Sequence, residues 1–385
     1  MNDSMNKKVG VLGSHGRVDG CSFMSTDELL AKVGQNTGNL LFQYAVTKAI
    51  GEDVCVIGSD LPWDVNRVKE ECRIIVIPSA NFIRENFDFS GMVNFLEKLD
   101  LPLVFLGLGA QAKDYDQDEF NFHPSIAKLM QLVKERCSIA GLRGEFTANL
   151  LEKFGVTNTS IIGCPTNFLN PDLELPVKLE EKWDNPIQSF VAAGDEPWPK
   201  DLSKRDAERK LIDWVYKGNG IFLQQSVEPF IKYLRRNNPY QNAEVPAHHE
   251  ESLRKAIAPD MTNEEFRGFV ATKLRVYYSV DQWLEDSARF DFSVGLRLHG
   301  NMAAWQSGTP AIWVHHDSRT RELAETMALP NISHQDFLKI ESIEELKNSL
   351  SYNFDHYKQV RNELLVNYHK IFREAGIKVQ AFGCE

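Results

Sequence analysis

Cysteine is scarce in this chain, which has six cysteines among 385 residues and no C-x-x-C pair. A disulfide scaffold or a structural zinc site requires cysteines paired at short spacing, so neither is expected. Cys55, Cys137 and Cys164 lie inside or beside apolar runs, which is typical of small core residues. This cysteine usage favours a reducing compartment, and we expect a cytoplasmic protein.

Long apolar runs are also missing. No stretch reaches the roughly 18 apolar residues that a transmembrane helix needs, so we expect no membrane-spanning segment. The N-terminal residues lack the apolar core of a signal peptide and lead directly into an apolar run at 9–13. If the protein meets a membrane, we expect a peripheral association with its inner face.

Positive charge is in deficit, with 43 Lys and Arg against 54 Asp and Glu and a formal net charge of −11. A nucleic-acid partner is not expected, because binding to phosphates along a strand needs a basic face. A local basic pocket for a small anion remains compatible with this balance. The composition, 43% hydrophobic and 25% charged, is that of a globular protein.

Short apolar runs alternate with helical patterns along the first 165 residues. The runs are mostly β-branched or aliphatic, which is typical of buried parallel strands. Helical patterns occur at 39–50, 125–136 and 145–154. The expected strands are 9–13, 54–57, 73–77, 103–106, 138–142 and 160–163. This alternation predicts a doubly wound α/β sheet.

A second α/β series follows the segment 171–186, which is rich in proline and charge and has the composition of a linker. Its expected strands are 190–194, 220–224, 292–296 and 310–314, with a mainly helical region at 228–288. We therefore expect two Rossmann-like lobes, 1–170 and 187–350. The remainder, 351–385, is expected to form a helix that packs back on the first lobe. Such an architecture places a ligand cleft between the lobes, at the carboxyl ends of the strands.

The sequence lacks the common cofactor and hydrolase motifs. Gly107-Leu108-Gly109-Ala110-Gln111-Ala112 has the glycine spacing of a dinucleotide-binding turn, but the acidic segment 113–119 follows where a helix should open. That segment also lacks the glycine of a calcium loop at its sixth position. No H-E-x-x-H, Walker A or G-x-S-x-G pattern occurs. We expect no bound cofactor and no metal.

A polar, glycine-containing loop precedes the first long helix. It reads Gly34-Gln35-Asn36-Thr37-Gly38-Asn39. Two interpretations remain open for this loop. It is either a capping loop that only starts the helix, or a polar nest that contacts hydroxyl groups or an anion.

The segment Gly295-Leu296-Arg297-Leu298-His299-Gly300-Asn301 carries the clearest chemical signal. It lies at the end of an expected strand, before a helix expected from Met302. Strand alternation predicts that Arg297 and His299 point to one side. An internal salt bridge with a satisfied histidine is one interpretation. We favour an anion site, because a buried arginine and histidine are costly without an anion.

Further basic residues follow the next expected strand in His315-His316-Asp317-Ser318-Arg319-Thr320-Arg321. The two adjacent histidines point apart, so a shared metal ion is not expected. Arg319 and Arg321 either add positive charge to the cleft or are solvated helix residues.

The sequence resembles the polysaccharide pyruvyl transferase family. The resemblance covers about 34 to 330 and rests on motifs that occur in order. They are the loop Gly34–Asn39, Gly107–Gln111, Leu142-Arg143-Gly144-Glu145, Gly163-Cys164-Pro165-Thr166, Arg297-Leu298-His299-Gly300 and Gly308-Thr309-Pro310. Two positions depart from the family pattern. Asn39 stands where aspartate is common, and Gly144 stands where the family usually has the aspartate of an Arg-Asp pair.

The resemblance implies a GT-B-like enzyme that transfers pyruvate from phosphoenolpyruvate to a sugar of a surface polysaccharide, as a ketal. On this hypothesis, phosphoenolpyruvate is the co-substrate and binds the element Arg297-Leu298-His299. Arg297 holds a donor anion, and His299 transfers the proton. Arg319 or Arg321 holds the second anionic group.

Asn36, Asn39 and Gln111 are expected to bind the saccharide acceptor on the first lobe. Whether that acceptor is lipid-linked, and whether the protein is a homo-oligomer, is left open.

The main alternative is a GT-B glycosyltransferase with a nucleotide-sugar donor. Such a donor would need an acidic residue at its ribose, for which Glu322 and Glu325 are candidates. A non-catalytic polysaccharide-binding or assembly protein is a further alternative, against which the pair Arg297 and His299 argues.

Overall fold

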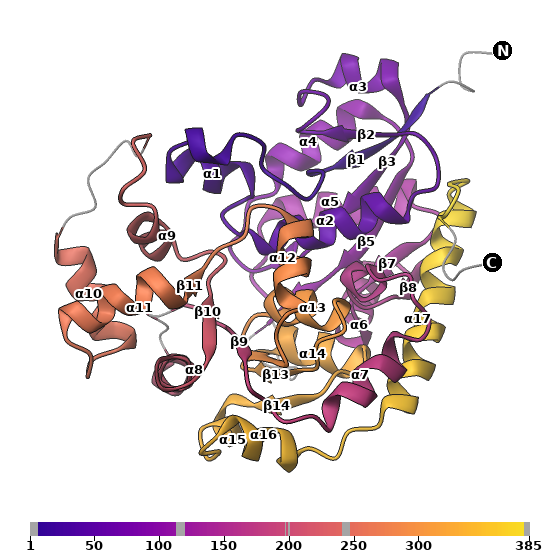
Figure 1. The fold of residues 1–385 in the computed structure, drawn as a ribbon. Helices are drawn as coiled ribbons and strands as arrows, with labels where there is room; N and C mark the ends of the chain where they lie inside the picture. Colours follow the sequence, from indigo (N-terminus) through magenta and orange to yellow (C-terminus); the bar gives the residue numbers. More distant parts are fainter. Residues whose placement is uncertain (1–6, 113–119, 197, 199–200, 241–246, 381–385) are drawn as a thin grey trace.

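The computed structural model describes residues 7–112, 120–196, 198, 201–240 and 247–380. The acidic segment 113–119 lies outside this part of the chain. Two six-stranded sheets, all of whose strands are parallel, form the centres of two lobes. Figure 1 shows the first sheet and its helices in indigo to magenta and the second in magenta to orange. The two expected Rossmann-like lobes are confirmed.

The sheet of the first lobe has the strand order β2-β1-β3-β5-β7-β8. Its strands are β1 (Lys8–Leu12), β2 (Val54–Ile57), β3 (Cys72–Pro78), β5 (Leu103–Leu108), β7 (Ala140–Leu142) and β8 (Thr159–Ile161). A small parallel pair joins β4 (Ile83–Arg84) to β6 (Ala110–Gln111). The helices are α1 (Thr26–Lys32), α2 (Gly38–Ala49), α3 (Val65–Glu71), α4 (Ser90–Leu99), α5 (Pro124–Arg136) and α6 (Glu145–Lys153). Two short 3₁₀ turns are η2 (Cys21–Phe23) and η3 (Pro165–Phe168).

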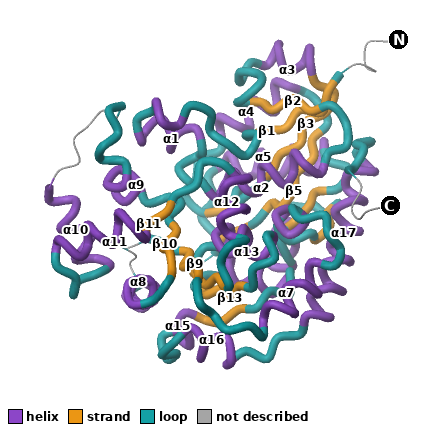
Figure 2. The backbone as a smooth tube through the Cα atoms, in the orientation of Figure 1, coloured by secondary structure: helices purple, strands orange, loops and turns teal. Residues whose placement is uncertain are grey.

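The sheet of the second lobe has the strand order β11-β10-β9-β12-β13-β14. Its strands are β9 (Phe190–Ala193), β10 (Gly220–Leu223), β11 (Leu274–Arg275), β12 (Phe292–Gly295), β13 (Ala311–His315) and β14 (Asn331–Ser333). The helices of this lobe are α8 (Leu202–Lys217), α9 (Glu228–Leu234), α10 (Ala247–Ile257), α11 (Asn263–Lys273), α12 (Val280–Ser287), α13 (Leu298–Gln306), α14 (Ser318–Thr326), α15 (His334–Phe337) and α16 (Ile343–Ser349). Figure 2 shows helices on both sides of the strands, as continuous apolar strands require.

The segment between the lobes is not only a linker, because it contains helix α7 (Leu175–Trp183). Composition did not predict this helix, although Pro176 lies at its start, where a missing N–H costs nothing. The last helix, α17 (Phe354–Glu374), packs on α7, β7 and β8. It runs beside the first lobe as the long yellow helix of Figure 1, so the expected return of the C-terminal helix is confirmed.

One apolar core extends through both lobes. It includes Val11 and Leu106 of the first sheet, Trp305 and Trp313 of the second lobe, and Tyr368 of α17. Helix α13 contacts both α2 and η3 across the lobe boundary. The two lobes are therefore held together by buried apolar surface as well as by chain connectivity. Among the described residues, no helix is long and apolar enough to cross a membrane.

Arg361 anchors α17 to the segment between the lobes. Its side chain is 1% exposed, and its guanidinium donates to the carbonyl oxygens of Asn167, Asn170 and Asp172 at 3.3, 2.6 and 3.1 Å. These carbonyl oxygens belong to η3 and to the segment between η3 and α7, so the arginine ties that segment to α17.

Arg361→Met should lower the free energy of unfolding by about 3–5 kcal/mol, because it leaves buried carbonyl oxygens without a donor. Urea unfolding followed by circular dichroism measures this change. Lys358→Met is the matched control on the same helix. Lys358 forms an exposed ion pair with Glu174 at 3.3 Å, and its loss should change stability by less than about 1 kcal/mol. Equal effects of the two substitutions would contradict the anchoring role of Arg361.

Candidate active site

A cavity of about 590 Å³ lies between the lobes, at the carboxyl ends of strands from both sheets. The first lobe contributes the loop before α2, the segment 80–84 after β3, and Arg143 directly after β7. The second lobe contributes Gln225 after β10, the segment 297–299 after β12, and Arg319 after β13. The cavity is therefore where two parallel sheets present their strand ends to each other, as expected for this architecture.

Arg297 and His299 both line this cavity, but not in the way that strand alternation predicted. Strand β12 ends at Gly295, and helix α13 begins at Leu298 rather than near Met302. Arg297 is the N-cap residue and His299 lies in the first turn of the helix. The prediction of a strand at these residues was wrong, because the sharp turn into the helix comes directly after the strand. Leu298 also lines the cavity.

Arg297 is held by a buried carboxylate. Its Nε forms an ion pair with Asp195, and its terminal nitrogen donates to Ser226 Oγ at 2.7 Å. Asp195 also pairs with Lys204 and lies 3.4 Å from His316 Nε2. Burial alone would raise the pKa of Asp195, but the charges of Arg297 and Lys204 lower it to about 2. Arg297 therefore has both an internal partner and a place in the cavity wall.

Arg143, which the sequence analysis did not assign to the site, lies in the cavity wall with its side chain 3% exposed. It donates to the carbonyl oxygen of Gly107 at 3.1 Å and to Asn81 Oδ1. Gly109 leaves room for it, because a Cβ there would lie 2.3 Å from Arg143 Cδ. The glycine motif after β5 thus accommodates an arginine rather than a dinucleotide. Burial lowers the pKa of Arg143 to about 10.

Arg84 and Arg319 complete the positive wall. Arg84 stacks on the ring of Phe87 at 3.8 Å, and Arg319 pairs with Asp317 at 3.4 Å. Within the described ranges, neither Arg84 nor Arg143 has a carboxylate within ion-pair distance. Among the described residues, those that line the cavity include four arginines, 84, 143, 297 and 319, and no aspartate or glutamate. An anion is the natural counterpart of such a wall.

His299 lies against this positive wall. Its ring packs on Phe42 at a centroid distance of 5.4 Å. Burial, followed by the charges of Arg143, Arg319 and Arg297, lowers the pKa of His299 to about 3. The imidazole is therefore neutral at neutral pH when no anion is present. A role in proton transfer, as the sequence analysis expects for His299, therefore requires a nearby negative charge that raises this pKa.

The predicted acceptor residues lie at and beside the cavity. Asn36 and Asn39 line it, but both also hold the loop together. Asn36 Oδ1 accepts from the Gly38 amide at 2.8 Å, and Asn39 donates to the Val33 carbonyl at 2.9 Å. Gln111 does not line the cavity and instead accepts from Asn81 at 3.2 Å. The loop thus has the capping role, and its polar side chains also face the cavity.

A second cavity of about 690 Å³ shares Arg84, Arg297 and Arg319 with the first. Its wall mixes charges of both signs. Its residues include Gln111, Asp195, Glu196, Asp201, Lys204, His316 and Asp317. Because carboxylates and cations alternate here, this wall offers both acceptors and donors of hydrogen bonds, unlike the wall of the first cavity.

The other candidates from the sequence lie away from both cavities. Arg321 is exposed and forms an ion pair with Glu325 at 2.7 Å, one turn along α14. Glu322 is buried and accepts from the Thr147 amide and hydroxyl at 2.9 and 3.1 Å, at the start of α6. Its carboxylate therefore joins the lobes and is not available to a ribose. Among the described residues, no group of His, Cys, Asp and Glu is arranged to hold a metal ion.

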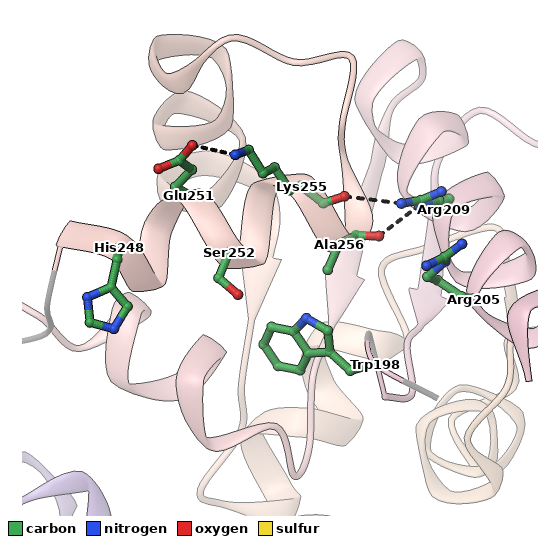
Figure 3. Close-up of a pocket in the computed structure, with 8 residues that line it drawn as sticks. All are labelled: Trp198, Arg205, Arg209, His248, Glu251, Ser252, Lys255 and Ala256. Atoms are coloured by element: carbon green, nitrogen blue, oxygen red, sulfur yellow. Dashed lines mark hydrogen bonds and ion pairs between the residues drawn. The ribbon is translucent and has the colours of Figure 1, made fainter. Parts of the chain in front are cut away.

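A third hollow, of about 630 Å³, lies on the second lobe alone, between α8 and α10 (Figure 3). Lys255 pairs there with Glu251 at 2.6 Å, and Arg209 donates to the carbonyl oxygens of Ala256 and Lys255. These cations already have partners, and none of the strand ends reaches this hollow. It is therefore not the candidate active site, although Trp198 is exposed in it.

The buried neutral histidines make stability depend on pH. His299 and His316 have pKa values lowered to about 3 and 4, mainly by burial. Between pH 6.5 and 4 the unfolded chain binds protons that the folded protein does not, so stability falls as the pH is lowered. His299→Gln should remove up to about 3 kcal/mol of that loss between pH 7 and pH 4.

Urea unfolding at a series of pH values measures the loss. His356→Gln, at an exposed position on α17, is the control and should leave the pH dependence unchanged. A pH dependence in His299→Gln as steep as in the wild type would show that His299 is not held neutral.

Three solved structures illustrate what the fold is similar to. The Anabaena protein HepE in complex with UDP and glucose has 12% identity and a TM-score of 0.48, covering 96% of this chain and 99% of its own. The UDP-GlcNAc 2-epimerase of Methanocaldococcus jannaschii has 11% identity and a TM-score of 0.45, covering 94% and 99%. The complex of MnaA from S. aureus with UDP has 8% identity and a TM-score of 0.40, covering 98% and 93%.

A search of curated proteins found no match. The sequence model of the polysaccharide pyruvyl transferases matches residues 36–318, a range that begins in the loop before α2 and ends at the start of α14. It includes Arg84, Arg143, Arg297 and His299 of the cavity wall. The chain therefore belongs to the polysaccharide pyruvyl transferase family.

Proposed function

We propose that the protein binds phosphoenolpyruvate in the cavity between the lobes and transfers its pyruvyl group to a saccharide as a ketal. The observation that carries this proposal is the cavity wall, which has four arginines and no carboxylate among the described residues. Phosphoenolpyruvate has a phosphate and a carboxylate, and arginine binds both through paired hydrogen bonds. Family membership supports the same donor.

The arginines divide between the two anionic groups of the donor. Arg143 and Arg84 have no carboxylate partner among the described residues, so an entering anion does not have to displace one. Arg297 and Arg319 already have aspartate partners, and these hold the guanidinium groups in place at the opposite wall. The donor would therefore lie between first-lobe and second-lobe arginines. This arrangement extends the hypothesis from the sequence, which named only second-lobe residues for the donor site.

His299 would become an acid when the donor binds. The positive charges of Arg143, Arg319 and Arg297 contribute to its low pKa. The phosphate and carboxylate of a bound donor offset these charges and raise the pKa of His299, because a nearby negative charge favours the imidazolium. The proton is then available only when the donor is present. An acid with a pKa near the working pH is suited to protonate the enol carbon.

The reaction proceeds by addition followed by elimination. Protonation of the methylene carbon leaves a cation at the carbon that carries the phosphate oxygen. One saccharide hydroxyl adds to this carbon, and the bond to the phosphate oxygen then breaks. A second hydroxyl closes the ketal ring. Of the two hydroxyl protons, one replaces the proton that the acid gave up and the other leaves with inorganic phosphate.

The saccharide acceptor would enter through the second cavity. Its alternating carboxylates and cations suit hydroxyl groups, which both donate and accept hydrogen bonds. Gln111 lies in that wall, and Asn36 and Asn39 lie at the donor cavity. The shared residues Arg84, Arg297 and Arg319 mark where donor and acceptor meet.

Binding of phosphoenolpyruvate to the wild type should raise the thermal unfolding midpoint. A ligand at 100 times its Kd adds about 2.7 kcal/mol to the free energy of unfolding. Arg143→Met and Arg84→Met should each lose most of this shift. Arg321→Met is the matched control, because Arg321 is exposed outside the cavity, and it should retain the shift. UDP, GDP and CMP serve as competing ligands. A shift with a nucleotide and none with phosphoenolpyruvate would favour a nucleotide-sugar donor instead.

Substitution of His299 should separate donor binding from turnover. In His299→Ala we expect the thermal shift with phosphoenolpyruvate to persist while ketal formation falls by about 100-fold or more. Ketal formation is followed by mass spectrometry across a panel of methyl glycosides, as the gain of one pyruvic acid less one water. Turnover at the wild-type rate in His299→Ala would exclude the role of His299 as the acid.

A further inference from the structure

Cys164 lies behind His299 and has no part in the reaction proposed above. It follows β8, at the N-cap of the 3₁₀ turn η3, and its side chain is 1% exposed. Its Sγ lies 3.7 Å from His299 Nε2, so a first-lobe thiol meets the second-lobe histidine across the lobe boundary. The two nitrogens of this ring therefore have different surroundings, with Nε2 directed to the protein interior.

In the described part of the chain, the thiol has one hydrogen-bond partner besides the histidine. Thr166 Oγ1 donates to Cys164 Sγ at 3.1 Å, so the sulfur already accepts a hydrogen bond. The thiol proton is then free to be donated to His299 Nε2, which is the other side-chain polar atom in contact with the sulfur among the described residues. Burial raises the pKa of Cys164, although Arg143 opposes this rise, so the sulfur keeps its proton. The hydroxyl, the thiol and the imidazole thus form a short series of hydrogen-bond contacts that ends at Nε2.

The other ring nitrogen, Nδ1, lies at the cavity side. A Cβ placed on Gly38 would lie 3.1 Å from His299 Nδ1, 3.0 Å from Asn36 Oδ1 and 2.4 Å from Gln225 Oε1. Nδ1 therefore lies close to the side-chain oxygens of Asn36 and Gln225, two residues that line the cavity together with His299. Phe42 packs against the ring, with the two ring planes tilted by 35°.

We propose that Cys164 is a positioning residue for His299. Its thiol donates to Nε2 and holds the neutral imidazole in the Nδ1–H form, so that the nitrogen facing the cavity carries the proton. When the ring is protonated, Nε2–H donates to the same sulfur and Nδ1 keeps its direction. The hydrogen bond at one ring nitrogen determines the state of the other. The consequence for catalysis rests on the proposed function, whereas the state of the ring does not.

Nitrogen NMR of protein with ¹⁵N-labelled histidine tests the state of the ring directly, with His299→Gln to assign the signals. The wild type should show His299 in the Nδ1–H form at pH 7. Cys164→Ala should shift the ring toward the Nε2–H form, and Cys164→Ser should restore part of the Nδ1–H form, because a hydroxyl also donates. Cys137→Ala is the control, since Cys137 is a buried cysteine after α5 that does not line the cavity. It should leave the His299 signals unchanged.

Turnover provides the second readout. Cys164→Ala should lower ketal formation by about tenfold and leave the thermal shift with phosphoenolpyruvate unchanged. An Nε2–H form in the wild type, or identical spectra of the wild type and Cys164→Ala, would overturn the proposal. A missing phosphoenolpyruvate shift in all variants would instead reject the proposed function, and the spectra would still decide the role of Cys164.

Discussion

The fold must hold several arginine guanidinium groups close together between its lobes, against their mutual repulsion. Four arginines border one space that contains no carboxylate from the described chain. Desolvation of such charges is costly, so the surrounding structure has to hold them against mutual repulsion. Asp195 and Asp317 do so from behind Arg297 and Arg319. Arg143 is held by a backbone carbonyl and by Asn81, which leaves its charge for a ligand.

Because this space lies between the lobes, the lobes must meet in a defined way. Glu322 reaches from α14 to the first turn of α6, and its carboxylate satisfies amide and hydroxyl donors there. Ser318 exchanges hydrogen bonds with the backbone of Ala112, and the Thr37 amide donates to the Gln225 carbonyl at 2.9 Å. With the apolar core that continues through both lobes, these contacts hold first-lobe arginines opposite second-lobe arginines.

The same charges set the chemistry of His299. A histidine beside several arginines stays neutral until an anion enters. The proposed acid is therefore protonated only when the negative charge of the donor raises its pKa. Cys164 on the far side of the ring leaves Nδ1 toward the cavity. A catalytic histidine is more often poised by a carboxylate that raises its pKa. Here the part of the carboxylate would be taken by the substrate itself.

Local patterns in the sequence are enough to predict the α/β class, most of the strands, the two lobes and the segment that contains Arg297 and His299. Those features depend on local patterns, since apolar runs form buried strands and basic residues at strand ends stand out in an acidic chain. The structure was needed to show that Arg84, Arg143 and Cys164 lie close to that segment, because these residues come from separate strand ends of the first lobe. It also decided that Arg321 and Glu322 do not, although both are close in sequence to Arg319. On α14, Arg321 points to solvent and Glu322 points to the first lobe. The spacing of residues in a sequence cannot show which surface each side of a helix will contact.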